Sequence, residues 1–546
     1  MGKVYGLFFG NHNYSTTLIV DGKIQYAIED ERITRIKSTY SWYEGPYTSL
    51  SVIEEKSGIS LEDADKICIC DPTLLFMTKN NNSFVKDLEK NKNFISRISK
   101  LKNKIEWVEH HESHAYSTYF VSGIKDKSII VTSDGGSYEK LCGSIWLGDN
   151  NNLKKVHSVE SFSNGSIGIM WYDICHFFNM IGNKDEGKIM GMAGHGEYNE
   201  YVYNSFKNIT KYEGNLKFSN AYNAEIAIYI YKNLENEGWF NGEKNKKIVA
   251  YNLQKYTEDI FMEYLNDISK KYPEYRNLCL AGGLFANVKL NQVINESGLF
   301  DNVFITPPMG DEGLSFGSAI KGSISIGDWD GVRKLENAFL GLEYTDEEIF
   351  NISKSYNNIN HEDFNYYKIA QLINEGNIVA LLNGKFEFGP RALGARSVMV
   401  RPTERKTHEV LNTRLERNEI MPFAPFVMSE YAHIIFDIKQ SEYTSEFMTM
   451  CYTVKDEWKD KLPAVIHEVD NTGRPQIVYK HKNPVFWNIL NEYNKISGIP
   501  VMLNTSFNGH GEPIINTPKQ SFQHLLKGTI DCLVAGDKIY KLENHE

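Results

Sequence analysis

The first residues of the chain carry the hydrophobic pattern of short β-strands. Residues 3–9 and 15–20 are apolar and rich in strand-forming residues, and the second run passes through Asp21-Gly22 into residues 23–29. An Asp-Gly pair between two such runs is a strong short-range signal for a hairpin turn. The pattern therefore predicts a strand, a loop, and a hairpin closed at Asp21-Gly22.

Further along, apolar runs alternate with a segment of helical spacing. Residues 127–136 and 277–283 are apolar strands that end in glycine pairs, Gly135-Gly136 and Gly282-Gly283. Between them, residues 256–272 place apolar positions on one helical face. Strands alternating with helices predict an α/β domain. Glycine-ended strands often bring backbone N–H groups close to phosphates, although glycine pairs alone are weak evidence.

The pattern breaks once and then resumes. Residues 322–348 are rich in Gly and Asp and mark the expected domain junction. Beyond them we expect a helix over residues 366–376 and strands over residues 377–382 and 498–504. No internal repeat is visible. The sequence thus predicts two domains.

Composition and charge narrow the class of protein. The chain has 546 residues, too many for one hydrophobic core, and a net charge of −11, which disfavours nucleic acid as a partner. The seven cysteines are scattered, without a Cys-x-x-Cys pair, and Cys68 and Cys70 alternate as in a buried strand. No basic leader or run of 18 apolar residues occurs, so we expect a cytoplasmic protein without a membrane span.

A metal site is indicated by two histidines and two aspartates. On a helix, His110 and His114 lie one turn apart on the same face, so both imidazoles can reach one ion. Two histidines at this spacing also occur on solvated faces, but Asp134 and Asp311 follow segments whose strand ends are expected to converge. Such ligands suit Fe(II), Mn(II) or Zn(II), and the spacing does not choose among them.

Two glycine-rich segments and one histidine are further candidates. Residues 187–196 and 281–291 bring bare backbone close to a partner, and Lys188 adds a positive charge, although tight helix packing would look the same. His12 stands alone on the loop after the first strand, where such domains place ligands, so it is a candidate base or substrate contact. A structural histidine is the alternative.

The C-terminal half offers two phosphate-binding candidates. In residues 388–397 glycines and a proline frame Arg391 and Arg396, and a rigid arginine turn suits bidentate phosphate recognition. The alternative is a pair of arginines that cap a loop. Residues 503–513 offer Asn504, Ser506 and Asn508 as polar contacts to a nucleotide, although a plain turn would look similar.

Taken in order, these motifs resemble the O-carbamoyltransferases that include the nodulation-factor, cephamycin and tobramycin carbamoyltransferases. The resemblance covers nearly the whole chain. It runs through HNYS, EDERITR, HHESHA, SDGG, EGKIMGMAGHG, AGGLFANVKLN, PPMGDEG, GPRALGARS, MPFAPF, HEVDNTGRPQ and LNTSFNGHGEP. The segments GPRALG-x-RS and NTSFN-x-x-GEP are its most specific parts.

The resemblance implies an α/β protein of two domains. Residues 1–345 would form an actin- and sugar-kinase-like transfer domain, similar to threonylcarbamoyl-transfer proteins, that holds the metal and the adenylate. Residues 346–546 would form an adenylating domain with a twisted mixed sheet. Such enzymes make carbamoyl-adenylate from ATP, with Mg, and carbamoyl phosphate, and then carbamoylate an acceptor hydroxyl.

The family's site residues carry over by position. Metal ligands fall on His110, His114, Asp134 and Asp311, for Fe(II) in the first place. Nucleotide contacts fall on Gly282, Gly283 and Asn287, with Gly135 and Gly136 beside them, and the acceptor-side histidine is His12. The phosphate contacts fall on Arg391, Arg396 and Ser506. Lys188 and Arg391 join His12 as expected catalytic residues.

The chain departs from the family at two places. Many relatives carry a lysine and an arginine before PFAP, where this chain has Glu416 and Met421, so Arg414 or Arg417 is expected to supply the missing charge. Tyr14 replaces a small residue after the family's histidine, which predicts a differently shaped acceptor pocket.

Three functions remain open at this point. The first is carbamoyl transfer to a sugar, nucleotide sugar or glycosylated metabolite, in a chain that could form homo-oligomers. The second is threonylcarbamoyl or hydrogenase-maturation chemistry, which the net charge of −11 and the lack of Cys-x-x-Cys pairs disfavour. The third is a nucleotide-binding relative without catalysis, suggested by the altered PFAP segment.

Overall fold

The chain folds into two compact units. The computed structural model describes residues 2–543 apart from 11, 39–47, 71–93, 95, 138, 161–165, 221–223 and 418–420. Unit 1 comprises Met1–Asp30 and Ser38–Leu335, and unit 2 comprises Glu31–Lys37 and Glu336–Glu546. The sequence placed the junction at 345/346 and gave no sign that a short N-terminal segment belongs to unit 2.

The first sheet of unit 1 has the strand order β3-β2-β1-β4-β5. Its strands are β1 (Lys3–Phe8), β2 (Ser15–Val20), β3 (Lys23–Glu29), β4 (Lys66–Cys70) and β5 (Ile105–Val108). The predicted hairpin is confirmed, because β2 and β3 are antiparallel and Asp21 and Gly22 between them have φ of 50° and 67°. Positive φ at both central residues is the requirement of a type I′ turn.

The second sheet of unit 1 repeats this topology. Its order is β12-β11-β6-β7-β8, from β6 (Ser128–Ser133), β7 (Leu141–Asp149), β8 (Asn152–Glu160), β11 (Asn277–Ala281) and β12 (Asn302–Ile305). In each sheet the first three strands along the chain pair antiparallel with one another in sequence order. The fourth strand pairs in parallel with the first, and the fifth pairs in parallel with the fourth. This duplicated sheet is the actin- and sugar-kinase-like arrangement. The sequence shows no repeat because the two halves share strand directions and not residues.

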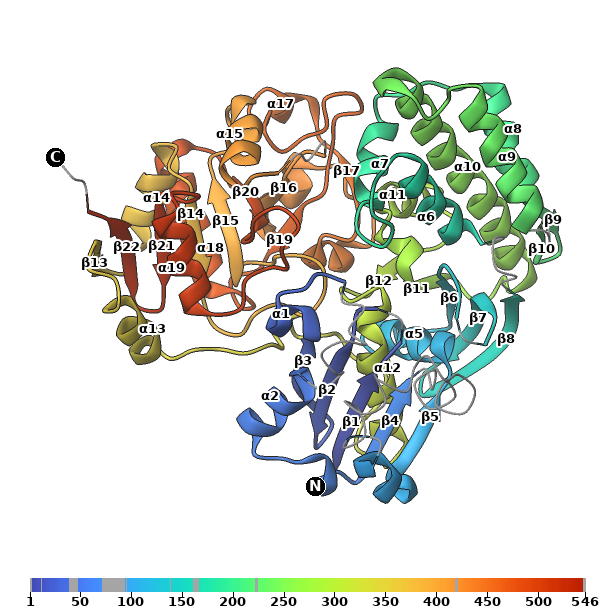
Figure 1. Ribbon diagram of the computed structural model, residues 1–546, viewed down its shortest axis with the longest axis horizontal. Helices are drawn as coiled ribbons and strands as arrows, with labels where there is room; N and C mark the ends of the chain where they lie inside the picture. The colour runs from blue at the N-terminus through green and yellow to red at the C-terminus, as the bar shows by residue number, and fades with distance from the viewer. Residues whose placement is uncertain are drawn as a thin grey trace. The chain divides into compact units, whose positions relative to one another are not determined.

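Two helices join the two sheets of unit 1. Helix α12 (Leu314–Ser325) packs on β1, β2 and β4, and helix α5 (His110–Tyr119) packs on β6, β7 and β11 and against α12 (Figure 1). The two helices approach at backbone distance, because a Cβ at Gly317 would lie 1.9 Å from the Ser113 carbonyl oxygen. Any side chain at Gly317 would therefore separate them.

The remaining helices of unit 1 form a mainly helical part beside the second sheet. They are α6 (Ile167–Phe177), α7 (Glu186–Ala193), α8 (Glu200–Ile209), α9 (Ala224–Asn236), α10 (Gly242–Lys271) and α11 (Val288–Glu296). A ribbon of β9 (Thr210–Gly214) and β10 (Lys217–Asn220) follows α8, and α2 (Thr48–Ser57) packs on the first sheet. The helix predicted over residues 256–272 is the second half of α10.

Unit 2 is built on one mixed sheet of eight strands in the order β13-β22-β21-β14-β15-β20-β16-β19. The strands are β13 (Ile359–Asp363), β14 (Val379–Leu382), β15 (Arg396–Val400), β16 (Ala424–Met428), β19 (Gln476–Val478), β20 (Val501–Ser506), β21 (Cys532–Ala535) and β22 (Lys538–Leu542). β14 pairs in parallel with β21, and β16 with β19, whereas the other neighbours are antiparallel. The mixed sheet expected for this domain is therefore present. β17 (Tyr452–Thr453) and β18 (Thr472–Gly473) form a separate ribbon.

Within residues 336–546, the described part of unit 2 has seven α-helices, several of which begin at a side-chain cap. They are α13 (Asp346–Ser353), α14 (Tyr366–Asn374), α15 (Lys406–Arg414), α16 (Ala432–Ile435), α17 (Asp456–Lys459), α18 (Pro484–Ser497) and α19 (Pro518–Leu526). Thr345 closes a capping box at the start of α13, and α18 ends at Gly498, whose φ is 74°. Helix α14 confirms the element predicted over residues 366–376, and it packs against α18. The short helix α1 (Asp30–Thr34) begins at Asp30, the last residue of unit 1 before the segment Glu31–Lys37, and continues into that segment.

None of the seven cysteines forms a disulfide, and all seven are buried, in accord with a packing role. Among the described helices, none combines the length and apolar character that a bilayer crossing requires.

Candidate functional site

Three elements of unit 1 bring the four predicted metal ligands together. Helix α5 begins at His110, and its first residues are fixed by Glu109, whose side chain accepts a hydrogen bond from the His111 N–H. His110 and His114 therefore lie one turn apart on one face. Asp134 follows the end of β6, and Asp311 opens the 3₁₀ turn η6 (Asp311–Gly313) that leads into α12.

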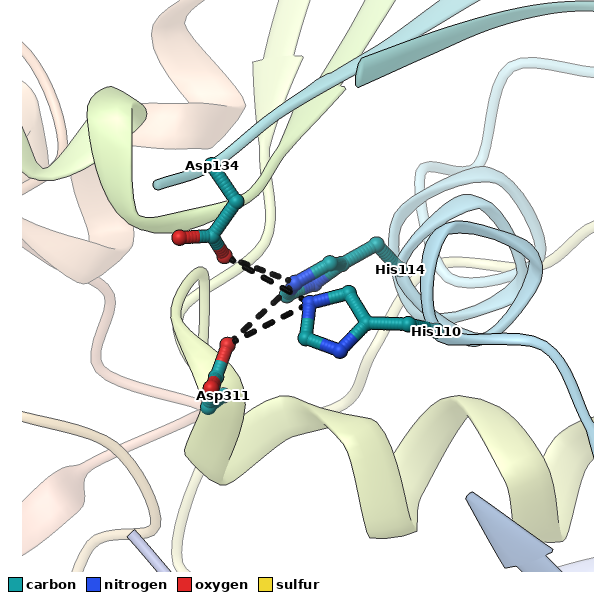
Figure 2. Close-up of side chains that lie close together, drawn as sticks. All are labelled: His110, His114, Asp134 and Asp311. Carbon is teal, nitrogen blue, oxygen red and sulfur yellow. Dashed lines mark hydrogen bonds and ion pairs between the residues drawn. The ribbon is translucent and has the colours of Figure 1, made fainter. Parts of the chain in front are cut away.

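The four side chains point at one another (Figure 2). The Nε2 atoms of His110 and His114 lie 3.7 and 3.2 Å from Asp134 Oδ2, and both lie 3.6 Å from Asp311 Oδ1. One ligand atom from each residue falls within 4.8 Å of the other three. The sequence grouped these four residues, and the structure places them in one cluster.

The cluster favours a bound positive charge. Both histidines are almost completely buried. Burial opposes ionisation of Asp134, yet hydrogen bonds with His110 and His114 hold the pKa of its carboxyl well below the usual range. Burial also disfavours a charged His114, yet hydrogen bonds to Asp134 and Asp311 raise the pKa of its imidazole. The carboxylates thus stabilise positive charge at this place, as they would stabilise a bound cation.

These residues fit a divalent metal ion. Two imidazole nitrogens and two carboxylate oxygens converge on one point from a buried side, which is the donor set of a borderline ion. The same set accommodates Fe(II), Mn(II) and Zn(II).

His12 lies at the edge of this cluster. Its Nε2 atom is 3.7 Å from Asp311 Oδ2. The neighbouring Asn13 donates from Nδ2 to Glu312 Oε2, and Glu312 Oε1 accepts the Gly310 N–H, so one carboxyl joins the two loops. Burial, together with the nearby Glu29, raises the pKa of the Glu312 carboxyl to about 8. Glu312 was missed because a glutamate after an aspartate carries no distinctive sequence signal.

His111 is a second residue that the sequence did not single out. Its Nδ1 atom lies 2.9 Å from Thr132 Oγ1, and Thr132 in turn lies 2.7 Å from Ser144 Oγ. This chain connects α5 to β6 and β7. Burial and the charges of His110 and His114 hold the pKa of His111 well below its ordinary value, so the imidazole is neutral.

Two of the predicted glycines touch the cluster. The Gly135 N–H donates to Asp134 Oδ1 at 2.6 Å, and the Gly283 N–H donates to Asp134 Oδ2 at 3.3 Å. Gly282 has φ of 110°, and a Cβ there would lie 2.1 Å from the Ser133 carbonyl oxygen, so only glycine fits between β6 and β11. Gly136 follows Gly135 and is exposed.

Asn287 and Lys188 have structural partners that the sequence did not predict. Asn287 Oδ1 caps α11 by accepting the Leu290 N–H, and its Nδ2 donates to Gln254 Oε1. Asn287 is therefore a helix cap, and its nucleotide contact stays a prediction. Lys188 Nζ pairs with Asp185 at 2.9 Å.

In unit 2, Arg396 is a structural arginine. Its side chain is completely buried, and its guanidinium donates to the carbonyl oxygens of Leu342, Asn383, Gly384, Ala395 and Asn516. The expected contact of Arg396 with phosphate is therefore corrected, because backbone carbonyls already surround the group. The loop-capping alternative describes this residue.

Glu387 explains the shape of the loop that carries Arg391. The Glu387 side chain is fully buried, and its Oε1 accepts the N–H groups of Leu393, Ala395 and Arg396. Arg391 itself is half-buried within the loop. Glu387 was missed because the sequence does not show that one carboxyl gathers three amides.

A second cluster in unit 2 surrounds Arg417. Its guanidinium donates to Thr505 Oγ1 at 2.7 Å, to Ser506 Oγ at 3.2 Å and to Asn508 Oδ1 at 2.8 Å. Arg414 instead pairs with Asp531 at 2.7 Å. Of the two arginines expected to replace the missing charge, Arg417 lies beside the predicted polar residues and Arg414 does not.

Asn504 is turned into the interior of the same unit. It is buried, and its Nδ2 donates to the Ala392 carbonyl oxygen at 2.7 Å. Asn504 thus holds the Arg391 loop to β20, and its nucleotide contact stays a prediction.

Solved structures with detectable likeness are distant. Full-length HypF in its phosphate- and nucleotide-bound form is 14% identical, with a TM-score of 0.33 over 60% of this chain and 47% of that chain. A ROK family protein from Streptococcus pneumoniae is 9% identical, with a TM-score of 0.30 over 60% of this chain and 100% of that chain.

Similarity in sequence is stronger. Nodulation protein NolNO of Sinorhizobium fredii is 28% identical over 97% of this chain and 79% of the relative. Protein MJ1051 of Methanocaldococcus jannaschii is 30% identical over 96% of this chain and 97% of the relative. The carbamoyltransferase N-terminus matches residues 77–320, and the carbamoyltransferase C-terminus matches residues 370–541. The chain therefore belongs to the carbamoyltransferase family and is an enzyme of carbamoyl transfer.

Proposed function

We propose that this enzyme forms carbamoyl-adenylate from ATP and carbamoyl phosphate and transfers the carbamoyl group to a hydroxyl of a sugar-containing small molecule. Water first hydrolyses carbamoyl phosphate to carbamate and phosphate. A carbamate oxygen then attacks the α-phosphorus of ATP, and pyrophosphate leaves. The acceptor hydroxyl then attacks the carbamoyl carbon, and AMP leaves. Adenylation is needed because carbamate is a poor electrophile, and AMP is a good leaving group.

The observation that carries the proposal is the four-residue cluster of unit 1 with His12 at its edge. His110, His114, Asp134 and Asp311 would hold the divalent ion. When bound, the ion would supply positive charge to the departing adenylate phosphate. His12 Nε2 lies 3.7 Å from Asp311 Oδ2, which supports His12 as the base that takes the proton from the acceptor hydroxyl.

The backbone around Asp134 suits the adenylate. The N–H groups of Gly135 and Gly283 point toward the Asp134 carboxylate, and the glycine backbone leaves room for a phosphate beside it. Exposed Gly136 is a further contact in this proposal. Lys188 would add positive charge from α7, with Asp185 as its partner in the absence of substrate.

The Arg391 loop and the Arg417 cluster would bind the phosphates in unit 2. The Arg417 guanidinium donates hydrogen bonds to the side chains of Ser506 and Asn508, so one guanidinium and two polar side chains lie together. Arginine suits this task because its planar donors match phosphate oxygens. Mg would accompany ATP at this site.

The resemblance to nodulation-factor carbamoyltransferases supports a sugar-containing acceptor, such as a nucleotide sugar or a glycosylated metabolite. The net charge of −11 disfavours tRNA, the acceptor of the threonylcarbamoyl alternative. No described residue cluster favours that second function.

The test is an assay of purified enzyme with ATP, Mg and carbamoyl phosphate. We expect pyrophosphate release, and mass spectrometry should find a carbamoyl mass increment within a panel of nucleotide sugars and glycosides. An Arg391→Met variant should lose pyrophosphate release, whereas Arg276→Met, an exposed surface pair with Asp301, should retain it. Absence of pyrophosphate and AMP with every acceptor would contradict the proposal, and carbamoylation of tRNA would replace it.

A further inference from the structure

The EDERITR motif near the N-terminus is not explained by the metal cluster of unit 1. Its residues Glu31–Arg35 belong to the segment Glu31–Lys37, which is part of unit 2. The chain thus leaves unit 1 after Asp30, contributes seven residues to unit 2 and returns at Ser38. Asp30 itself stays in unit 1, where its buried carboxylate accepts the Ser49 N–H.

Arg32 contacts the loop that carries Arg391. Its side chain is almost fully buried, and its Nη2 donates to the carbonyl oxygens of Glu387 at 3.2 Å and Gly389 at 2.9 Å. Its guanidinium carbon lies 5.6 Å from the centre of the Phe386 ring. Arg32 thus holds the main chain at the start of this loop, while the Glu387 carboxylate holds its end.

Arg35 contacts the other loop of the proposed phosphate site. Its Nη1 and Nη2 atoms donate to the carbonyl oxygens of Ile514 and Pro513, each at 2.7 Å. Its guanidinium also lies 3.9 Å from Glu512 Oε2, which accepts the Gly509 N–H. The Glu512 carbonyl oxygen in turn accepts from Asn508, the residue that binds Arg417.

The backbone of this segment is set for these contacts. Arg35 has φ of 66°, in the left-handed region that residues with a side chain seldom occupy. Such a conformation persists where surrounding contacts hold it. Here the contacts are the two short hydrogen bonds of its guanidinium.

We propose that Arg32 and Arg35 are positioning residues for the proposed phosphate site of unit 2, each holding one of its two loops. This inference rests on the proposed function for its catalytic consequence, but its structural part does not. The adenylating unit would therefore include the segment Glu31–Lys37 as well as residues 336–546.

The structural part is tested by hydrogen–deuterium exchange of the full-length enzyme. Arg32→Met should speed exchange in residues 387–396, and Arg35→Met should speed exchange in residues 509–516, with the other loop less affected in each case. The Arg→Lys variants should give intermediate rates because lysine keeps one donor. Arg405→Met is the control, because Arg405 is an exposed arginine of unit 2 that pairs only at the surface with Glu468.

The catalytic part is tested by pyrophosphate release. The KM for ATP or carbamoyl phosphate should rise about tenfold in the two Met variants, as loss of a positioning hydrogen bond predicts. The KM of Arg405→Met should equal that of the wild type. If wild-type enzyme releases no pyrophosphate, the proposed function fails, and the exchange experiment still decides the structural part.

Three results would overturn the inference. One is unchanged exchange in both loops. Another is faster exchange spread evenly over unit 2, which would mean a general loss of stability. The third is faster exchange in the loops with unchanged KM values, which would reduce the arginines to packing. If Arg32→Met does not fold, two other variants still separate these outcomes. They are Arg35→Met, which replaces a half-buried side chain, and Arg32→Lys.

Discussion

The metal cluster of unit 1 and the arginine loops of unit 2 use buried charge in opposite ways. In unit 1, two imidazoles and two carboxylates point at one another, and the hydrogen bonds between Asp134 and His114 favour the charged forms of these two residues. In unit 2, the buried guanidinium of Arg396 is surrounded by backbone carbonyl oxygens. Converging side chains can bind an ion, whereas a guanidinium that faces carbonyls fixes the shape of a loop. Residue type alone does not separate these roles.

The largest expected effect is loss of metal from the unit 1 cluster. His114→Ala or Asp311→Asn should weaken binding of Fe(II), Mn(II) or Zn(II) by more than about 100-fold, because even outer partners of a ligand typically contribute 10- to 100-fold. Metal content after dialysis against defined free metal measures this. Asp301→Asn, at an exposed surface pair, should bind as the wild type does. Equal metal content in all variants would show that the unit 1 cluster does not bind the ion, and the contrast between the two units would be wrong.

Arg396→Met should test the other side of the comparison. Arg396→Met removes the hydrogen bonds from the buried guanidinium to five carbonyl oxygens, which should lower the free energy of unfolding by about 3 kcal/mol. Urea unfolding of unit 2 measures the change, with Arg405→Met as the control near zero. A variant that unfolds like the wild type but no longer binds ATP would make Arg396 a ligand after all.

Gly317→Ala should disturb the metal cluster without touching a ligand. The added Cβ would lie 1.9 Å from the Ser113 carbonyl oxygen, so α12 must move away from α5. We expect a loss of about 2 kcal/mol in unfolding free energy and weaker metal binding. Gly187→Ala, in helix α7 with nothing within 4 Å of its Cβ, should change stability by less than about 0.5 kcal/mol. Matching results for the two variants would show that the close approach of α5 and α12 is not needed.

A pH-dependent effect on stability is expected at Asp173 of α6. Burial raises the pKa of its carboxyl to about 6, although a hydrogen bond with Tyr231 opposes the shift. Because the folded state holds this proton more tightly, the stability it contributes is present below about pH 4 and is lost as the pH rises to about 6. Asp173→Asn should therefore be more stable than the wild type at pH 7, and the difference should shrink toward pH 4. Urea unfolding of both proteins at pH 7 and pH 4 measures this. A stability difference that does not change with pH would contradict the raised pKa of Asp173.

The sequence was informative where function depends on local spacing. His110 and His114 fall on one face because a helix repeats every 3.6 residues, and Asp134 follows a strand that its apolar run predicts. The hairpin at Asp21-Gly22 was predictable from its turn chemistry. These features need only neighbouring residues.

The sequence was silent where a role depends on distant backbone. Arg396 is surrounded by carbonyls from residues as far apart as Leu342 and Asn516, which no local pattern reveals. The same holds for Arg32 and Arg35, whose partners lie more than 350 residues away. The repeated sheet topology of unit 1 could not be predicted, because the identities of the residues do not reveal the order of the strands in a sheet.

The central claim is that unit 1 transfers the carbamoyl group and unit 2 forms the adenylate. The most direct test measures both half-reactions in Asp311→Asn, with Asp301→Asn beside it. The account predicts pyrophosphate release within about threefold of the wild type, and a carbamoylated product reduced by more than about 100-fold. An equal fall of pyrophosphate release and product in Asp311→Asn would contradict the division of labour.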